Sequence, residues 1–221
     1  IMTTAVGQSI GILQSMRIEQ AAGLNGNRYA TFHQLNKEQA QKLHEDERLY
    51  EVGDIIFIGS KPLGNSSLSL YLREYHDNAL SMYPAIGNVK EGRLPEQANE
   101  IALSEDTIQY LGLDAALGNT ISLDLRTSVM DGSLPEVKYA ADFVLTGILE
   151  GSYIGYASGT VEGIVGNKTA EKLLPEEYLL YSTDFKTYDK QNFQSIIYDL
   201  AAELNVNERY IQYNWILLDA I

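Results

Sequence analysis

The three histidines are the residues of this chain best suited to bind a metal ion or to transfer a proton. They are His33, His44 and His76, which lie 11 and 32 positions apart. A zinc site carried by one helix uses histidines four positions apart, and neither interval matches that spacing. We therefore expect solvated or strand-edge histidines, no metal ligands and no cofactor.

The residues offer little support for nucleophilic or acid–base catalysis. The 221 residues include no cysteine, which excludes a thiol nucleophile, a thiolate metal site and a disulfide framework. No Gly-x-Ser-x-Gly elbow is present. The 30 acidic residues create many carboxylate pairs by chance, so no glycosidase pair can be selected. We predict no catalytic residue and no enzyme activity in this chain.

One glycine-rich segment is superficially similar to a phosphate-binding loop. Residues 159–169 read GTVEGIVGNKT. A P-loop requires glycine directly before the lysine and again five positions earlier, so that backbone amides can surround the phosphates. Asn167 and Glu162 occupy those two positions, and a carboxylate would repel phosphate. The segment is not expected to bind nucleotides.

Composition narrows the classes of partner. The net charge is −14 and the sequence pI is near 4.5, so the surface repels nucleic acid and attracts cations. No apolar run approaches the roughly 18 residues that a membrane-spanning helix needs. The first residue is isoleucine, so we interpret the chain as part of a longer protein.

The flanking parts of the chain read as alternating helices and strands. Before residue 88 we expect an amphipathic helix over the first fifteen residues and strands at 29–33, 55–58 and 68–72. We also expect a helix that begins at a capping box formed by Asn36 and Gln39. After residue 150 we expect strands at 161–165, 178–181 and 210–213 and short helical turns at 169–174. The clearest helix is 193–204, with Asp189 as its N-cap and Asn205 at its end.

The segment between them is rich in strands and turns. Strands are expected at 100–103, 121–126 and 143–149, with a short helix at 105–111 capped by Ser104 and ended by Gly112 in a left-handed conformation. We therefore predict an α/β (α+β) protein. A larger discontinuous lobe of strand–helix–strand units comprises 1–87 and 151–221, and a small strand-rich lobe, 88–150, is inserted into it.

Residues 91–123 carry a resemblance to a known family. They read EGRLPEQANEIALSEDTIQYLGLDAALGNTISL, with Gly-Arg-Leu-Pro, then Asn-Glu-Ile-Ala-Leu-Ser, Leu-Gly-Leu and Leu-Gly-Asn-Thr-Ile in that order. This pattern resembles the extracytoplasmic (periplasmic core) domain of MacB-like and FtsX-like ABC transporter permeases. The match is close over 91–123 and 143–149 and looser from residue 29 to the end.

The resemblance implies a domain between the first two membrane helices of a permease. Its partners would be the rest of the permease, a cytoplasmic ATPase subunit that hydrolyses ATP, a second permease in a dimer, and a peptide or lipid substrate. No long extra hairpin for gripping an outer-membrane channel is evident, which favours a cell-membrane protein of Gram-positive type. The domain would relay motion outward or recognise an extracellular ligand, and its two ends should emerge on the same side. No functional residues can be carried over, because the matching motifs are structural.

Two other functions remain open. A free-standing secreted module could bind glycans or peptides through some of the 15 tyrosines. A hydrolase would need a deep cleft that holds two acids within about 5–10 Å of each other.

Overall fold

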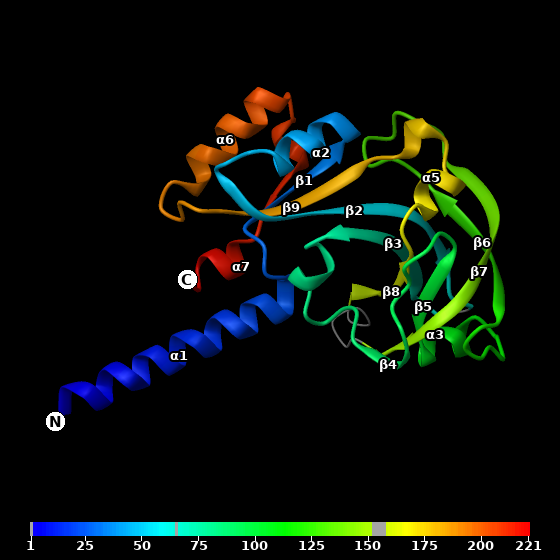
Figure 1. The fold of residues 1–221 in the computed structure, drawn as a ribbon, viewed down its shortest axis with the longest axis horizontal. Coiled ribbons are helices and arrows are strands. Elements are labelled where there is room, and N and C mark those ends of the chain that lie inside the picture. Colours follow the sequence, from blue (N-terminus) through cyan, green and yellow to red (C-terminus); the bar gives the residue numbers. More distant parts are fainter. Residues whose placement is uncertain (1, 65, 152–157) are drawn as a thin grey trace.

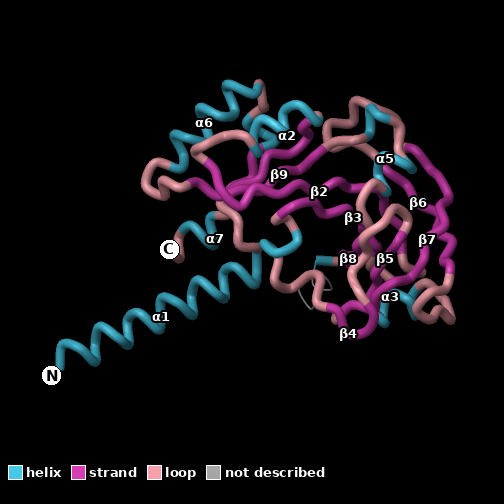
Figure 2. The backbone as a smooth tube through the Cα atoms, in the orientation of Figure 1, coloured by secondary structure: helices cyan, strands magenta, loops and turns pink. Residues whose placement is uncertain are grey.

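A computed structural model describes residues 2–64, 66–151 and 158–221. It contains one ten-stranded mixed sheet with helices packed on it, and a long helix, α1, that projects from the body (Figures 1 and 2). The α/β (α+β) fold class is confirmed.

The strands follow the chain in this order: β1 Ala30–Leu35, β2 Leu49–Pro62, β3 Ser69–Asp77, β4 Val89–Gly92, β5 Glu100–Ser104, β6 Thr120–Thr127, β7 Val137–Leu149, β8 Thr160–Val165, β9 Tyr181–Thr187 and β10 Ile211–Tyr213. The helices are α1 Met2–Asn25, α2 Lys37–His44, α3 Glu105–Tyr110, α5 Thr169–Leu173, α6 Phe193–Leu204 and α7 Trp215–Leu218. Within the described ranges, short 3-10 turns lie at Leu80–Met82, Glu176–Tyr178 and Glu208–Tyr210.

The sheet curls back on itself. Its strand order is β10-β1-β9-β2-β3-β8-β5-β7-β4, with parallel pairs only at β3–β8 and β5–β7 among the described strands. Strand β6 pairs with β7 along its length and also meets β2 where Arg126 lies opposite Ser60. The sheet therefore closes around an interior that the alternating apolar residues of β6 fill from one side.

Two main hydrophobic clusters stabilise the two ends of the sheet. The larger cluster lies inside the curled part and includes Leu72, Leu103 and Phe143. The second lies between the β10-β1-β9-β2 end and helices α2 and α6, and it includes Phe32 and Phe185. Burial of these side chains is the main driving force for both parts.

The strands of the predicted insert occupy one end of the sheet. β4, β5 and β7 are consecutive at that end, and β6 pairs with β7. They share the larger hydrophobic cluster with β2, β3 and β8 of the flanking segments. The division into lobes at residues 88 and 150 stays a prediction.

The local signals for helix ends are confirmed. Asn36 and Gln39 form the predicted capping box at the start of α2. Ser104 accepts a hydrogen bond from the backbone amide of Thr107 at the start of α3. Gly112 and Asn205 adopt the left-handed conformation after α3 and at the end of α6.

Two predicted features are wrong near residues 178 and 189. Residues 176–178 form a 3-10 turn after Pro175, and the strand begins only at Tyr181. Asp189 accepts hydrogen bonds from the amides of Gln191 and Asn192 in the turn before α6, so it lies outside the helix. Asn192 is the residue at the N-cap. Short polar side chains favour such turns as readily as caps, which explains the error.

Helix α1 differs from the short amphipathic helix that the sequence predicts. It extends to Asn25, and Ile10, Leu13 and Met16 are about 60% exposed instead of packed on the body. Its last turns reach the body, where Ile18 and Ala21 pack with Leu217 of α7. Among the described residues no helix is long and apolar enough to cross a membrane.

The glycines of the 159–169 segment serve packing. A Cβ atom on Gly163 would lie 2.5 Å from a methyl carbon of Leu72, and one on Gly166 would lie 1.9 Å from the carbonyl oxygen of Gln97. Thr169 at the start of α5 donates to the carbonyl oxygen of Gly166. These residues join β8 and α5 to the loop before β5.

We expect Gly166→Ala to lower the free energy of unfolding by about 1–3 kcal/mol or more, because the new methyl group meets rigid backbone. Chemical denaturation would measure the change. The matched control is Gly11→Ala, since a Cβ there has open space and alanine favours a helix. Equal stability of the two variants would contradict the packing role of Gly166.

Candidate functional site

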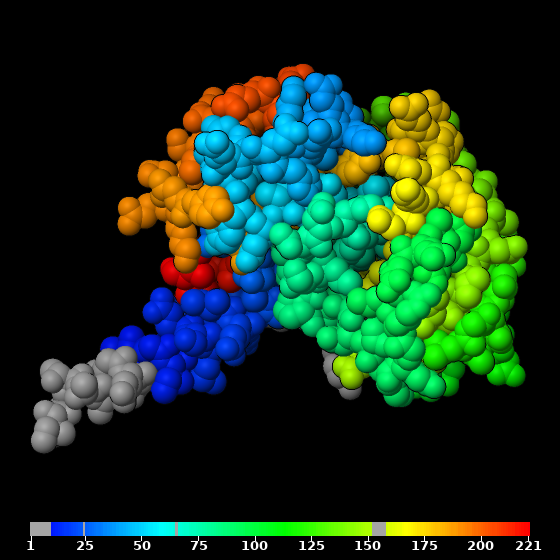
Figure 3. All heavy atoms as spheres, in the orientation of Figure 1, coloured from blue at the N-terminus to red at the C-terminus, as the bar shows by residue number. Residues whose placement is uncertain are grey.

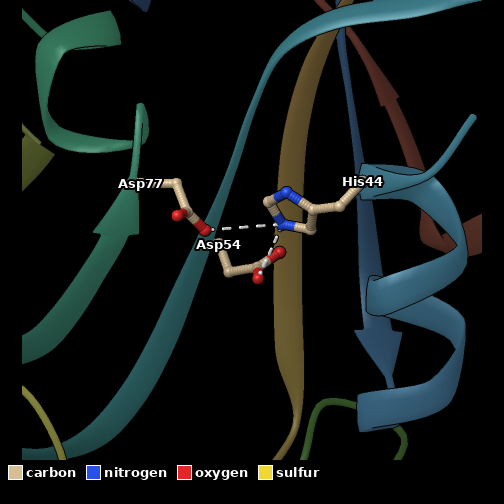
Figure 4. A group of neighbouring side chains, drawn as sticks. All are labelled: His44, Asp54 and Asp77. Carbon is tan, nitrogen blue, oxygen red and sulfur yellow. Dashed lines mark hydrogen bonds and ion pairs between the residues drawn. The ribbon is translucent and has the colours of Figure 1, made fainter. Parts of the chain in front are cut away.

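The structure brings together one histidine and two aspartates from three elements. His44 ends α2, Asp54 lies within β2 and Asp77 ends β3 (Figure 4). His44 Nε2 lies 2.9 Å from Asp54 Oδ2 and 3.7 Å from Asp77 Oδ2. One ligand atom from each residue falls within 4.8 Å of the others. We call this group the His44–Asp54–Asp77 cluster.

The register of the sheet and a hydrogen bond to the other oxygen of Asp54 position the cluster. The antiparallel pairing of β2 with β3 places Gly53 opposite Asp77 and Asp54 opposite His76. Thr183 on β9 donates to Asp54 Oδ1 at 2.6 Å, which leaves Oδ2 directed at the histidine. Asp54 is mostly buried, whereas the Asp77 side chain is 61% exposed. The cluster thus has one fixed carboxylate and one that is free to adjust.

A second histidine–carboxylate pair lies beside this cluster. His76 bonds to the buried carboxylate of Glu74, which also accepts from the backbone amide of Ala170. The hydrogen bond that His44 donates to Asp54 raises the pKa of His44, and the one that His76 donates to Glu74 raises the pKa of His76.

All three histidines are hydrogen-bonded to other side chains. His33 lies on β1, which pairs with β9 on one side and with β10 on the other. It forms hydrogen bonds with Ser182 and Gln212. The spacing of histidines along the chain could not reveal these contacts, since each involves a distant part of the chain or a strand neighbour.

A pocket of about 220 Å³ opens where the end of α1 meets the body. Its wall combines apolar side chains, such as Ile86 and Leu149, with Arg28 and the ion-paired Glu162. Nη1 of Arg28 is buried and has no hydrogen-bond partner among the described residues. The pocket therefore combines an apolar wall with a few polar groups, as sites for small ligands do. The His44–Asp54–Asp77 cluster is not part of its lining.

Behind this pocket lies a buried polar network centred on Asp184. The carboxylate accepts from Tyr83 Oη at 2.7 Å and from the hydroxyl of Thr31, and Arg28 Nε lies 3.6 Å away. Arg28 Nε also donates to Tyr83 Oη. Burial raises the pKa of Asp184, although the charge of Arg28 opposes that shift. Burial also raises the pKa of Tyr83 well above its usual range.

A carboxylate at the start of β5 makes stability sensitive to acid. The hydrogen bond from Arg93, helped by the amides of Glu96 and Gln97, lowers the pKa of Glu100 to about 2. The folded-state pKa is below the unfolded value, so the stabilisation is present above about pH 4.5 and is lost as pH falls towards 2.

We expect the stability of Glu100→Gln to vary less with pH between 4.5 and 2 than that of the original chain. Urea denaturation at several pH values would measure the difference. Glu105→Gln is the control, because that exposed carboxylate pairs with Lys90 on the surface. Identical pH profiles for the original chain and Glu100→Gln would contradict the assignment.

The C-terminal segment is tied to the base of α1. The buried Asn214 side chain donates to the carbonyl oxygens of Gly26 and Arg28, both at 2.8 Å, and accepts from Asn25. Helix α7 then packs on the last turns of α1. Figures 1 and 3 show α1 and the C-terminus leaving the body on the same side, as the family resemblance implies. Residue 1 itself lies outside the described residues.

Comparison with solved structures identifies the fold. The fold is that of the periplasmic region of MacB. One similar structure is the periplasmic region of MacB from Actinobacillus actinomycetemcomitans, with a TM-score of 0.52 and 13% sequence identity. The alignment covers 89% of this chain and 93% of that chain. Family models and curated protein sequences give no match. The resemblance predicted from residues 91–123 is therefore confirmed at the level of the fold.

Proposed function

We propose that this chain is the extracytoplasmic domain of an ABC transporter permease. The likeness to the MacB periplasmic region extends over nearly the whole of both chains, and this observation supports the proposal most. The arrangement of α1 and α7 agrees with it, since two segments that lead to neighbouring membrane helices must leave a domain together.

In this role the domain would relay movement of membrane helices to the outside. Helix α1 is a 24-residue lever whose last turns contact α7 and whose base is bonded to Asn214. A displacement of α1 would therefore move the C-terminal segment with it. The pocket beside Arg28 lies at this junction. The binding of a ligand there would therefore depend on the position of α1 or would change that position.

The proposed partners are the membrane part of the permease, a second permease and a cytoplasmic subunit that hydrolyses ATP. The chain itself would carry out no catalysis. A peptide or a lipid would be the substrate. The Gram-positive-type location rests on the sequence pattern alone and stays a prediction.

Affinity purification of the full-length protein from detergent-solubilised membranes tests this assignment. We expect an ATP-hydrolysing subunit to copurify with it. The isolated 221-residue chain is the control, and it should not retain that subunit, because the contacts are expected on the cytoplasmic side. Recovery of the full-length protein from the soluble fraction without an ATPase would contradict the proposal and favour the secreted binding module.

A further inference from the structure

We propose that the His44–Asp54–Asp77 cluster binds one divalent transition-metal cation, with Zn²⁺ as its representative. This inference does not depend on the proposed function. It departs from the sequence-based expectation of no metal ligands, because the three residues become neighbours only in the folded chain.

The distances fit a metal site that needs little rearrangement. Zn²⁺ binds imidazole nitrogen and carboxylate oxygen at about 2.0–2.2 Å, which places ligand atoms about 3.4 Å apart at a tetrahedral angle. The two distances from His44 Nε2, 2.9 and 3.7 Å, lie on either side of this value. The exposed Asp77 side chain can adjust its position, whereas a hydrogen bond to its other oxygen fixes the carboxylate of Asp54.

The bond that holds Asp54 is of the kind that supports metal ligands. Thr183 Oγ1 donates to Asp54 Oδ1, so the second oxygen, Oδ2, remains directed at His44. Outer hydrogen bonds of this kind fix the orientation of ligating carboxylates. Thr183 is fully buried, and the interior of the sheet therefore keeps this bond away from water.

Charge also favours a cation. Among the described residues, neither Asp54 nor Asp77 forms an ion pair with lysine or arginine, and the carboxylates of both lie within 4 Å of His44 Nε2. The neighbouring Glu74 bonds to His76, and Lys186 pairs with Glu51. Two carboxylates and a neutral imidazole carry a charge of −2, which a divalent cation balances.

The ligand types select the class of metal. Imidazole binds zinc and other transition metals well, whereas Ca²⁺ and Mg²⁺ prefer a shell made of oxygen alone. Asp77 and His44 are partly exposed, so water would fill the remaining coordination position. The cation would join the end of α2 to β2 and β3, and thereby stabilise that part of the sheet.

Calorimetric titration of the EDTA-treated 221-residue chain with ZnCl₂, at one fixed pH, tests the proposal. We expect one Zn²⁺ per chain, binding at least about tenfold more tightly than Ca²⁺. His44→Gln and Asp77→Asn should each weaken Zn²⁺ binding at least about tenfold. Both side chains are partly exposed, so these variants should fold, and circular dichroism would verify it.

The matched control is His33→Gln, a histidine of β1 outside the cluster, which should bind Zn²⁺ as the original chain does. Co²⁺ adds a second readout, since ligation by His44 should produce visible absorption that His44→Gln lacks. Absence of Zn²⁺ binding by the original chain would overturn the proposal. Unchanged affinity in both His44→Gln and Asp77→Asn would overturn it as well, because the cation would then bind elsewhere.

Discussion

Replacing Asp184 with alanine is expected to lower the free energy of unfolding by about 3–5 kcal/mol. Asp184 is fully buried and accepts hydrogen bonds from Thr31 and Tyr83. It is also the carboxylate nearest to the buried Arg28 guanidinium. Its removal would leave a cation and two hydroxyls without their acceptor in the interior, and that loss is larger than the value of the ion pair itself.

Urea denaturation of Asp184→Ala beside Asp199→Ala would measure this effect. Asp199 is exposed on α6, and its replacement should change stability by no more than about 0.5 kcal/mol. The double variant Arg28→Met, Asp184→Ala should recover part of the loss, because it removes the uncompensated charge. A loss in Asp184→Ala no larger than that in Asp199→Ala would show that the network contributes little.

The second large effect is expected from Phe32→Ala, at about 3–5 kcal/mol. The Phe32 ring is fully buried and meets the ring of Phe185 edge-on, with centroids 5.1 Å apart and planes at 87°. It lies in the cluster that holds α2 and α6 on the sheet. Truncation would remove buried apolar surface. It would also leave a cavity between the sheet and the helices, which cannot move together freely enough to fill it.

Thermal or urea denaturation would measure the loss, with Tyr198→Ala as the control. Tyr198 is an aromatic residue of α6 that is 74% exposed, so its truncation should cost little. If both variants lost the same stability, the second hydrophobic cluster would not be what holds this end of the sheet together.

Features that depend on near neighbours in the chain could be predicted from the sequence. The tight turn at 117–120 predicted the strand that follows it, β6, in which Ile121, Leu123 and Leu125 are buried. Asn36 with Gln39, and Ser104 with Gly112, predicted the ends of α2 and α3 because their hydrogen bonds and backbone conformations are local.

Features that depend on the folded chain escaped prediction. The spacing of His44, Asp54 and Asp77 has no periodic signature, since the pairing of β2 with β3 and the packing of α2 bring them together. The exposed apolar side chains of α1, such as Ile10 and Leu13, were expected to pack because sequence alone does not show that the helix projects. The resemblance at 91–123 identified the fold, while the candidate site lies entirely outside that segment.

The pocket and the proposed metal site occupy different parts of the domain. The pocket lies where α1 joins the body, so movement of the helix would change the shape of the pocket directly. The His44–Asp54–Asp77 cluster joins α2 to the sheet. A cation there would stiffen the part of the body to which the C-terminal segment is also connected through β10 and β1. The two sites can therefore be tested separately.

The side of the membrane on which this chain lies tests the central proposal most directly. The chain has no cysteine, so Tyr198→Cys in a full-length protein without other cysteines provides a single exposed thiol. Ile197→Cys, at a buried position, is the control for folding, and it should react only after denaturation. Intact cells would be treated with a membrane-impermeant maleimide. Tyr198→Cys should be labelled in intact cells, whereas labelling only after lysis would contradict an extracytoplasmic location.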